Sequence, residues 1–153
     1  MAAKDIYHKH VRAALEKDGW TITHDPLTFP WAGRAVKMDL GAERRDGALI
    51  SAEKGARKIA VEVKSFVSRS RMDDLENALG QLRLYRHILT LRQPERALYL
   101  AVREEVYQNF FDHPDVVAFL QTEQVRLLVF APATEVILQW IDWTNTETSL
   151  SES

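Results

Sequence analysis

The first candidate for chemistry is a pair of opposite charges, Glu62 and Lys64, two positions apart in the β-rich run 58–66. Side chains alternate between the two faces of a strand, so both charges project from one face while Val61 and Val63 project from the other. A carboxylate and an ammonium group held side by side can bind a cation and stabilise negative charge on a substrate. An ordinary solvated Glu and Lys on a half-exposed strand is the alternative that the motif alone leaves open.

The neighbouring segments favour an interior position for this strand. Residues 48–53 form a second β-rich run, and the short turn between the two runs predicts an antiparallel hairpin. A long helical pattern and a further apolar strand follow the run at 58–66. Because an unpaired charge inside a covered sheet is costly, two adjacent charges on an interior strand indicate that they line a cleft.

Asp39, between Met38 and Leu40, would bring a second carboxylate to this cleft. Two carboxylates can bind a divalent cation, which polarises a phosphate and lowers the pKa of a bound water. Lys64 would then orient that water or balance the developing negative charge. This combination predicts metal-dependent phosphodiester hydrolysis, and a strand-end aspartate with no such role is the alternative for Asp39 taken alone.

Composition narrows the chemistry further. The 153 residues contain no cysteine, which excludes a cysteine nucleophile, a cysteine-ligated zinc site and a disulfide framework. The five histidines form no HExxH or comparable zinc-binding cluster, so carboxylate oxygen is the main metal ligand on offer and suits magnesium or manganese. A net charge of -2 and the lack of a long apolar stretch near the N-terminus predict a cytoplasmic protein with no membrane partner and no global attraction to nucleic acid.

These groups need a scaffold, and hydrophobic periodicity predicts one. Helical spacing is found at 5–18, at 72–91 and, interrupted at Pro114, at 104–121, while strand patterns are found at 20–24, 97–102, 126–130 and 135–141. Residues 28–37, which contain Pro30 and Gly33, predict a loop or an irregular strand. This order of elements predicts an α/β (α+β) fold, a mixed sheet flanked by helices on both sides. We expect one domain over residues 1–143 and a flexible tail over 144–153.

The pattern of Asp39 followed by Glu62-Val63-Lys64, between a preceding and a following helix, resembles that of the PD-(D/E)XK nuclease superfamily. More specific stretches resemble the XisH family, the fdxN-element excision controlling factors of cyanobacteria. These stretches lie at 3–8, 18–26, 39–43, 58–66, 78–81 and 95–102. The resemblance extends from about residue 3 to residue 141, which is nearly the whole chain.

The resemblance implies a restriction-endonuclease-like core and a part in the excision or rearrangement of a DNA element. It implies three partners: DNA, a site-specific recombinase and a XisI-like companion protein. It also implies that Asp39, Glu62 and the backbone carbonyl of Val63 bind Mg²⁺ or Mn²⁺ and that Lys64 is the catalytic lysine. Residues 44–47 make the connection after Asp39 longer than the family pattern. Three other residues are therefore alternatives for the upstream metal ligand: Glu43, Asp46 and Glu53.

Three further residues are supporting candidates for the same site. Asp5 and His8 lie three positions apart on one polar face of the first helix, where related nucleases contribute an acidic residue. Gln81 flanks the apolar stripe of the long helix and would help to position substrate or water. A solvated surface residue is the alternative for each of them.

Two surface features bear on partners. Basic residues around the motif strand are candidates for phosphate contacts, namely Lys54, Arg57, Lys58, Arg69, Arg71, Arg83 and Arg86. The long helix also has apolar residues outside its main stripe, namely Leu84, Ile88 and Leu91. This second apolar surface favours either a homo-oligomer or packing under a later helix of the same chain.

Two functions follow from these observations. In the first, the chain is a Mg²⁺-dependent endonuclease of the excision machinery, with Asp39, Glu62 and Lys64 at its site. In the second, it keeps the nuclease fold but acts as a non-catalytic regulatory partner of a recombinase or of a XisI-like companion protein. A toxin–antitoxin-like pair is a variant of the second function.

Overall fold

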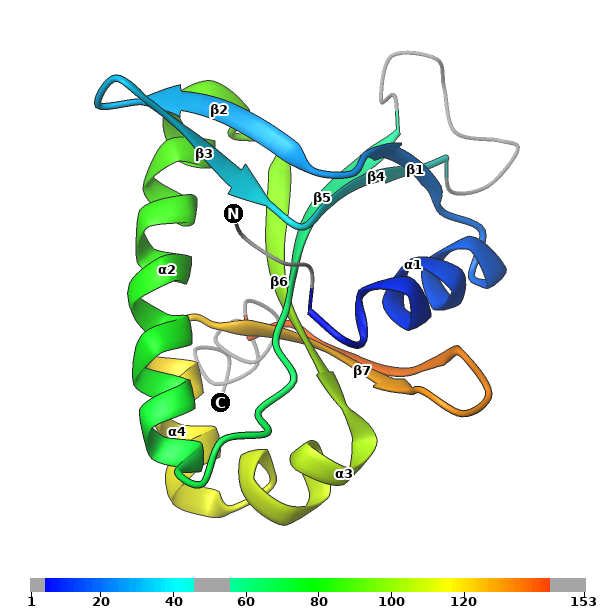
Figure 1. The fold of residues 1–153 in the computed structure, drawn as a ribbon, viewed down its shortest axis with the longest axis vertical. Coiled ribbons are helices and arrows are strands. Elements are labelled where there is room, and N and C mark those ends of the chain that lie inside the picture. The colour runs from blue at the N-terminus through cyan, green and yellow to red at the C-terminus, as the bar shows by residue number, and fades with distance from the viewer. Residues whose placement is uncertain (1–4, 46–55, 144–153) are drawn as a thin grey trace, which may run out of the picture.

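A six-stranded mixed sheet forms the centre of the computed structural model, which describes residues 5–45 and 56–143 (Figure 1). Across the sheet, the strands are β1 (Thr21–His24), β4 (Leu40–Arg44), β5 (Arg57–Val63), β6 (Arg96–Arg103), β7 (Arg126–Ala131) and β8 (Val136–Ile141). The pairs β5–β6 and β6–β7 are parallel, and the other three are antiparallel. The motif strand β5 is therefore interior, as the sequence predicts.

Helices cover both faces of this sheet, which confirms the predicted fold class (Figure 1). On one face lies α1 (His8–Lys17), and on the other lie α2 (Arg71–Arg92) and α4 (Pro114–Thr122). Between β6 and α4 come the short helix α3 (Glu104–Val106) and the π-helical turn η1 (Tyr107–Phe111). The arrangement is compatible with a restriction-endonuclease-like fold.

Alternation along β5 divides its side chains between two buried clusters. Val61 packs in the cluster that contains Val11 of α1, whereas Ala60 packs in the cluster that contains Leu82 of α2. Glu62 has the parity of Ala60, so its side chain projects toward the α2 face. The face that the sequence assigns to Glu62 is thus the one covered by α2.

The long helix closely follows its predicted range of 72–91. It begins after Ser70, whose hydroxyl oxygen accepts a hydrogen bond from the backbone N–H of Asp73 at 3.0 Å, and it ends at Arg92, shortly before Pro94. Of its second apolar surface, Ile88 is buried in the α2-face cluster, Leu84 is partly buried against it, and Leu91 stays exposed. The fold of this chain therefore covers two of these three residues without a second copy.

A two-stranded hairpin replaces the loop or irregular strand predicted for residues 28–37. Its strands are β2 (Leu27–Trp31) and β3 (Arg34–Met38), which pair in regular antiparallel register. Both residues of the turn, Ala32 and Gly33, have positive φ, as a tight hairpin turn requires. Pro30 is tolerated because each strand of a two-stranded ladder is an edge, where a missing N–H costs little.

The hairpin predicted around β5 also needs correction. Its proposed first strand, 48–53, lies outside the described residues, and so does the tail predicted at 144–153. The antiparallel neighbour of β5 is instead β4, with Leu40 opposite Val61, while β6 occupies the other edge. Within residues 5–45 and 56–143, no helix has the combination of length and apolar character needed to cross a bilayer.

Candidate functional site

Asp39 lies at the junction between the hairpin and the main sheet, as the single residue between β3 and β4. Its neighbour Leu40 is paired with Val61, so the junction faces the end of β5. The Asp39 backbone N–H donates to Oε1 of Glu62 at 3.2 Å, and the Val63 backbone N–H donates to Oδ2 of Asp39 at 2.8 Å. The Glu62 carboxylate therefore binds the backbone of Asp39, and the Asp39 carboxylate binds the backbone of the residue after Glu62.

Lys64 completes the predicted group. It follows directly after β5, and its backbone N–H donates to the carbonyl of Ala101 at 3.3 Å, which continues the contact with β6. Its Nζ lies 3.7 Å from Oε2 of Glu62. The structure thus brings Asp39, Glu62 and Lys64 together, and Oδ1 of Asp39 and Oε2 of Glu62 are the oxygens that these backbone contacts leave for other ligands.

Burial gives this group unusual electrostatics. The side chain of Glu62 is only 7% exposed. Burial raises the pKa of Glu62 from 4.5 to about 8, the negative charge of Asp39 adds to the rise, and Lys64 opposes it. At neutral pH the protonated form of Glu62 is therefore favoured until additional positive charge enters the site.

The site opens into a cleft of about 430 Å³. The supporting candidates Asp5, His8 and Gln81 all line it, Gln81 from α2 and the other two from the start of the chain. Asp5 is partly engaged in local structure, because its Oδ1 accepts a hydrogen bond from the Tyr7 backbone N–H at 2.9 Å. The structure therefore places every predicted candidate within the described ranges at one cleft, apart from Glu43.

Glu43 lies elsewhere and is not brought to the cleft. It is on β4 opposite Lys58, and its Oε1 is 4.0 Å from the Lys58 Nζ. Lys58 is also 3.8 Å from Glu95, so these three residues form a separate group at the other end of β5. The remaining alternatives, Asp46 and Glu53, lie outside the described residues. Of the two candidate upstream ligands that the structure describes, Asp39 contacts Glu62 and Glu43 does not line the cleft.

A histidine–aspartate pair at the cleft was not predicted as a unit. Nε2 of the buried His8 lies 2.7 Å from Oδ1 of Asp25, and Arg12 donates to Oδ2 of Asp25 at 2.7 Å. The other ring nitrogen, Nδ1, is 4.0 Å from Oδ1 of Asp39. The spacing of His8 and Arg12 on one helical face was the available signal, but nothing in the sequence brings Asp25, a predicted turn residue, to them.

Tyr85 is a second cleft residue that was not among the predicted site residues. Its position in the apolar stripe of the long helix predicts a core residue, and its side chain is indeed buried. Burial, with a further contribution from the charges of Glu62 and Asp39, raises the pKa of the Tyr85 phenol well above its usual value. The hydroxyl therefore stays protonated and can act only as a neutral hydrogen-bonding group.

The donor atoms of this site fit a hard divalent cation. Two carboxylates and the Val63 backbone supply oxygen, the ligand that Mg²⁺ and Mn²⁺ prefer. The positive charge of a cation would also offset the burial that, together with the charge of Asp39, favours the protonated form of Glu62. Across the described ranges, no three His, Asp or Glu side chains converge as a ready-made metal cluster, so water or substrate would have to complete the coordination.

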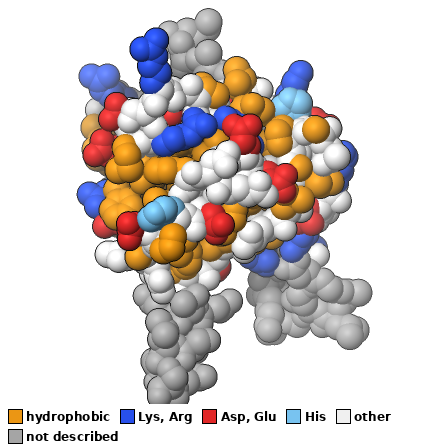
Figure 2. Space-filling model, turned by 90° about the horizontal axis from the view of Figure 1, so that it is seen from below, with side chains coloured by type: hydrophobic (Ala, Val, Ile, Leu, Met, Phe, Trp, Pro, Cys, Tyr) orange, Lys and Arg blue, Asp and Glu red, His pale blue; other side chains and the backbone are white. Residues whose placement is uncertain are grey.

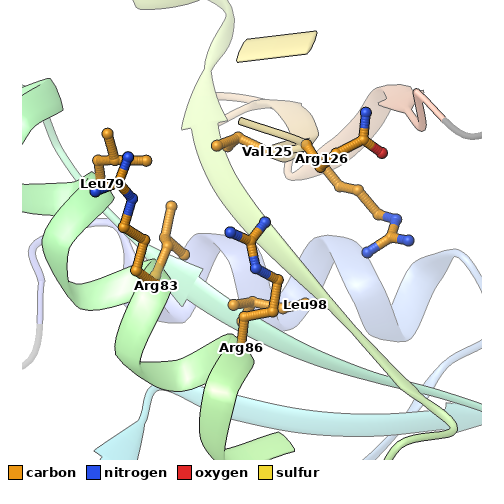
Figure 3. A pocket seen from close by; sticks show the side chains of 8 residues that line it. Leu79, Arg83, Arg86, Leu98, Val125 and Arg126 are labelled. Carbon is orange, nitrogen blue, oxygen red and sulfur yellow. The ribbon is translucent and has the colours of Figure 1, made fainter. Parts of the chain in front are cut away.

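Of the basic residues predicted to contact phosphate, Lys54 lies outside the described residues, and three others are engaged in contacts within the protein. Arg83 pairs with Glu123 at 2.5 Å, and Arg86 donates to the Glu123 backbone carbonyl at 2.8 Å. Both line a small pocket that shares no lining residue with the cleft (Figure 3). Arg71 is engaged with the Phe66 carbonyl, and the face seen in Figure 2 mixes acidic and basic side chains. Phosphate contact by these residues stays a prediction.

Known proteins resemble this chain over nearly its whole length. The family model described as XisH protein matches residues 1–138. An XisH family protein from Nostoc punctiforme is 43% identical, with 90% of this chain and 100% of that chain covered at a TM-score of 0.78. An fdxN element excision controlling factor protein from Anabaena variabilis is 41% identical, with 91% and 100% covered at a TM-score of 0.78. No curated protein matches.

Proposed function

Since this chain belongs to the XisH family, we propose that it acts in the cytoplasm in excision of a DNA element and hydrolyses phosphodiester bonds with Mg²⁺ or Mn²⁺. A relative carries the name excision controlling factor, which supports the first part. The convergence of Asp39, Glu62 and Lys64 in one cleft supports the second. These residues match the PD-(D/E)XK pattern, so we assign the chain to that nuclease superfamily as part of the proposal.

Each residue has a distinct task in this reaction. The cation would be held by three oxygens: Oδ1 of Asp39, Oε2 of Glu62 and the Val63 carbonyl. When bound, it would polarise the phosphate and lower the pKa of a water molecule. Glu62 must release its proton to do so, because only the carboxylate is a ligand. Lys64, beside Glu62, stabilises the negative charge that builds on the phosphate oxygens.

The proposed reaction is the hydrolysis of a phosphodiester bond. The oxygen of water forms a bond to phosphorus while the bond from phosphorus to the departing sugar oxygen breaks. The attacking water releases one proton, which reaches solvent through the groups that accept its hydrogen bonds, and the departing oxygen takes one from solvent. The products are a phosphate monoester end and a free hydroxyl end.

Cleavage of supercoiled plasmid DNA with Mg²⁺ or Mn²⁺ tests this proposal. We expect wild-type protein to nick the plasmid and Glu62→Gln to lower the rate by about 10²-fold or more, because a ligand and its charge are removed. Glu43→Gln, which changes the same residue type at the other end of β5, is the matched control and should keep the wild-type rate. Equal nicking by wild type and Glu62→Gln would point to a contaminating nuclease.

A binding function without catalysis is the second candidate, and one surface favours it. An apolar groove of about 300 Å³ between α2 and α4 is lined by Met72, Leu75, Leu79, Val116 and Phe119. Such a groove suits an apolar face of a recombinase or of a XisI-like companion protein, including an antitoxin-like one. If calorimetry detects no binding of a divalent cation at millimolar concentration, while a small companion protein is recovered by pull-down, this function replaces hydrolysis.

A further inference from the structure

The imidazole of His8 is held in a defined state by its neighbours. Its Nε2 lies 2.7 Å from Oδ1 of Asp25, and a carboxylate can only accept a hydrogen bond, so the ring hydrogen is on Nε2. Arg12 donates to the other oxygen of Asp25 at 2.7 Å, so both carboxylate oxygens accept hydrogen bonds from the α1 side chains. In the neutral ring, Nδ1 therefore carries a lone pair and acts as an acceptor.

Within the described part of the protein, no group donates a hydrogen bond to this lone pair. Nδ1 is fully buried, although His8 is one of the residues that line the cleft. Leaving a buried acceptor unpaired destabilises the folded protein, and a purely structural histidine would avoid this by bonding through both nitrogens. Nδ1 lies 4.0 Å from Oδ1 of Asp39.

The separation of these two acceptors fits one molecule that donates to both. Two hydrogen bonds of about 2.8 Å that meet at about 90° span the 4.0 Å between Nδ1 and Oδ1. We infer that His8 and Asp39 together hold the water that attacks phosphorus, an inference that rests on the proposed hydrolysis. With both hydrogens directed at His8 and Asp39, the oxygen lone pairs of this water face the rest of the cleft, where the phosphate must bind.

Two substitutions of His8 separate this role from a structural one. In His8→Asn, the side-chain amide ends near the place of Nδ1, so an acceptor toward Asp39 remains while the contact with Asp25 is lost. In His8→Gln, the amide reaches the place of Nε2, so the contact with Asp25 remains while the acceptor at Nδ1 is lost. The water-holding role depends on the group at Nδ1, whereas a structural role depends on the 2.7 Å contact with Asp25.

The measurements are kcat and KM for plasmid nicking, Mn²⁺ affinity by calorimetry, the melting temperature, and the ring ¹⁵N shifts of His8. We expect His8→Gln to lower kcat by about 10²-fold, since a misplaced nucleophile loses the advantage of orientation. We expect His8→Asn to stay within about tenfold of wild type in kcat. KM and Mn²⁺ affinity should change little in either variant, and the wild-type ¹⁵N shifts should show the hydrogen on Nε2.

The contrary outcomes are distinct. Wild-type kcat in His8→Gln, with Glu62→Gln inactive, overturns the role of His8 and leaves the hydrolysis standing. A large loss of Mn²⁺ affinity in His8→Gln shows that Nδ1 binds the cation, and a larger loss of kcat in His8→Asn than in His8→Gln shows a structural role, so either overturns the inference. A hydrogen on Nδ1 does the same. Wild-type protein that does not cleave DNA with either cation ends both proposals.

Discussion

The two ends of β5 carry the same kinds of side chain in different surroundings. At one end Lys58 lies 4.0 Å from Glu43 and 3.8 Å from Glu95, and at the other Lys64 lies 3.7 Å from Glu62, which contacts Asp39. Each end thus has two carboxylates and one lysine. Glu43 is 35% exposed, however, whereas Glu62 is 7% exposed.

Exposure to water, rather than residue type, therefore decides which of these groups can do chemistry. Around Lys58, solvent screens the charges, and such a surface cluster contributes little to stability. Around Glu62, burial and the charge of Asp39 raise the carboxyl pKa to about 8, so binding of a cation changes the charge state of the site. The comparison can be tested by making the same change at both ends.

Loss of the lysine charge is expected to give the largest difference. Lys64→Met keeps most of the aliphatic side chain and should lower the nicking rate by about 10²-fold, because the charge that stabilises the phosphate is removed. Lys58→Met should leave the rate unchanged. Both melting temperatures should stay near that of wild type, and a collapse for Lys64→Met would instead assign Lys64 to a structural ion pair.

The pH dependence of stability gives the next largest effect. Because the folded-state pKa of Glu62 is about 8 and its ordinary value is 4.5, the folded protein holds this proton more tightly than the unfolded chain does. The free energy of unfolding should therefore fall as pH rises from about 4.5 to 8, by an amount on the order of a few kcal/mol.

Urea unfolding between pH 4.5 and 9, without divalent cations, measures this effect. Glu62→Gln has no proton to lose and should reduce the fall with pH. If the slope of the two proteins is the same, the carboxyl of Glu62 is ionised throughout and the contrast between the two ends of β5 is smaller than inferred.

A smaller effect is expected from Asp39→Asn, which removes the negative charge that adds to the raised pKa of Glu62. The amide oxygen can still accept the hydrogen bond from the Val63 backbone N–H, so the local fold should persist. The pKa of Glu62 should fall below 8 yet stay above 4.5, since burial is the larger cause. A ¹³C-detected titration of the Glu62 carboxyl measures this pKa. An unchanged value would show that the charge of Asp39 does not contribute to the raised pKa of Glu62.

The smallest change is predicted at the exposed end. Glu43→Gln should alter the free energy of unfolding by less than about 1 kcal/mol, as is usual for exposed ion pairs. It should also leave the slope between pH 5 and 8 as in wild type. Thermal unfolding at low and high salt checks this, and a large destabilisation would show that the pairs around Lys58 are more than a screened surface cluster.

The parts of the fold that were predicted correctly depend on local pattern. The long helix follows from local pattern, because its apolar spacing and Pro94 lie within one stretch of chain. The common face of Glu62 and Lys64 follows from alternation alone. The meeting of Asp39 with Glu62 is different, because it was expected from the resemblance to the PD-(D/E)XK pattern, with Glu43, Asp46 and Glu53 as alternatives.

The parts that were missed depend on pairing between distant segments. A strand with Pro30 in it resembles a loop until its ladder partner is known, and 48–53 resembles a hairpin partner for β5 as much as β4 does. Asp25 is a plain turn residue in sequence and reaches His8 only through the path of β1 beside α1. Burial of Glu62 likewise arises from α2 packing over the sheet, which no local pattern encodes.

The position of Asp39 makes the length of its connection part of the site. Met38 is fixed by its pairing with Leu27 in the hairpin, and Leu40 is fixed by its pairing with Val61 in the main sheet. One residue spans the two ladders, so its side chain is aimed by secondary structure on both sides. An inserted or deleted residue here would misdirect the carboxylate even if every side chain of the cleft were kept. A connection of one residue cannot accommodate such a change without shifting one of the two ladders.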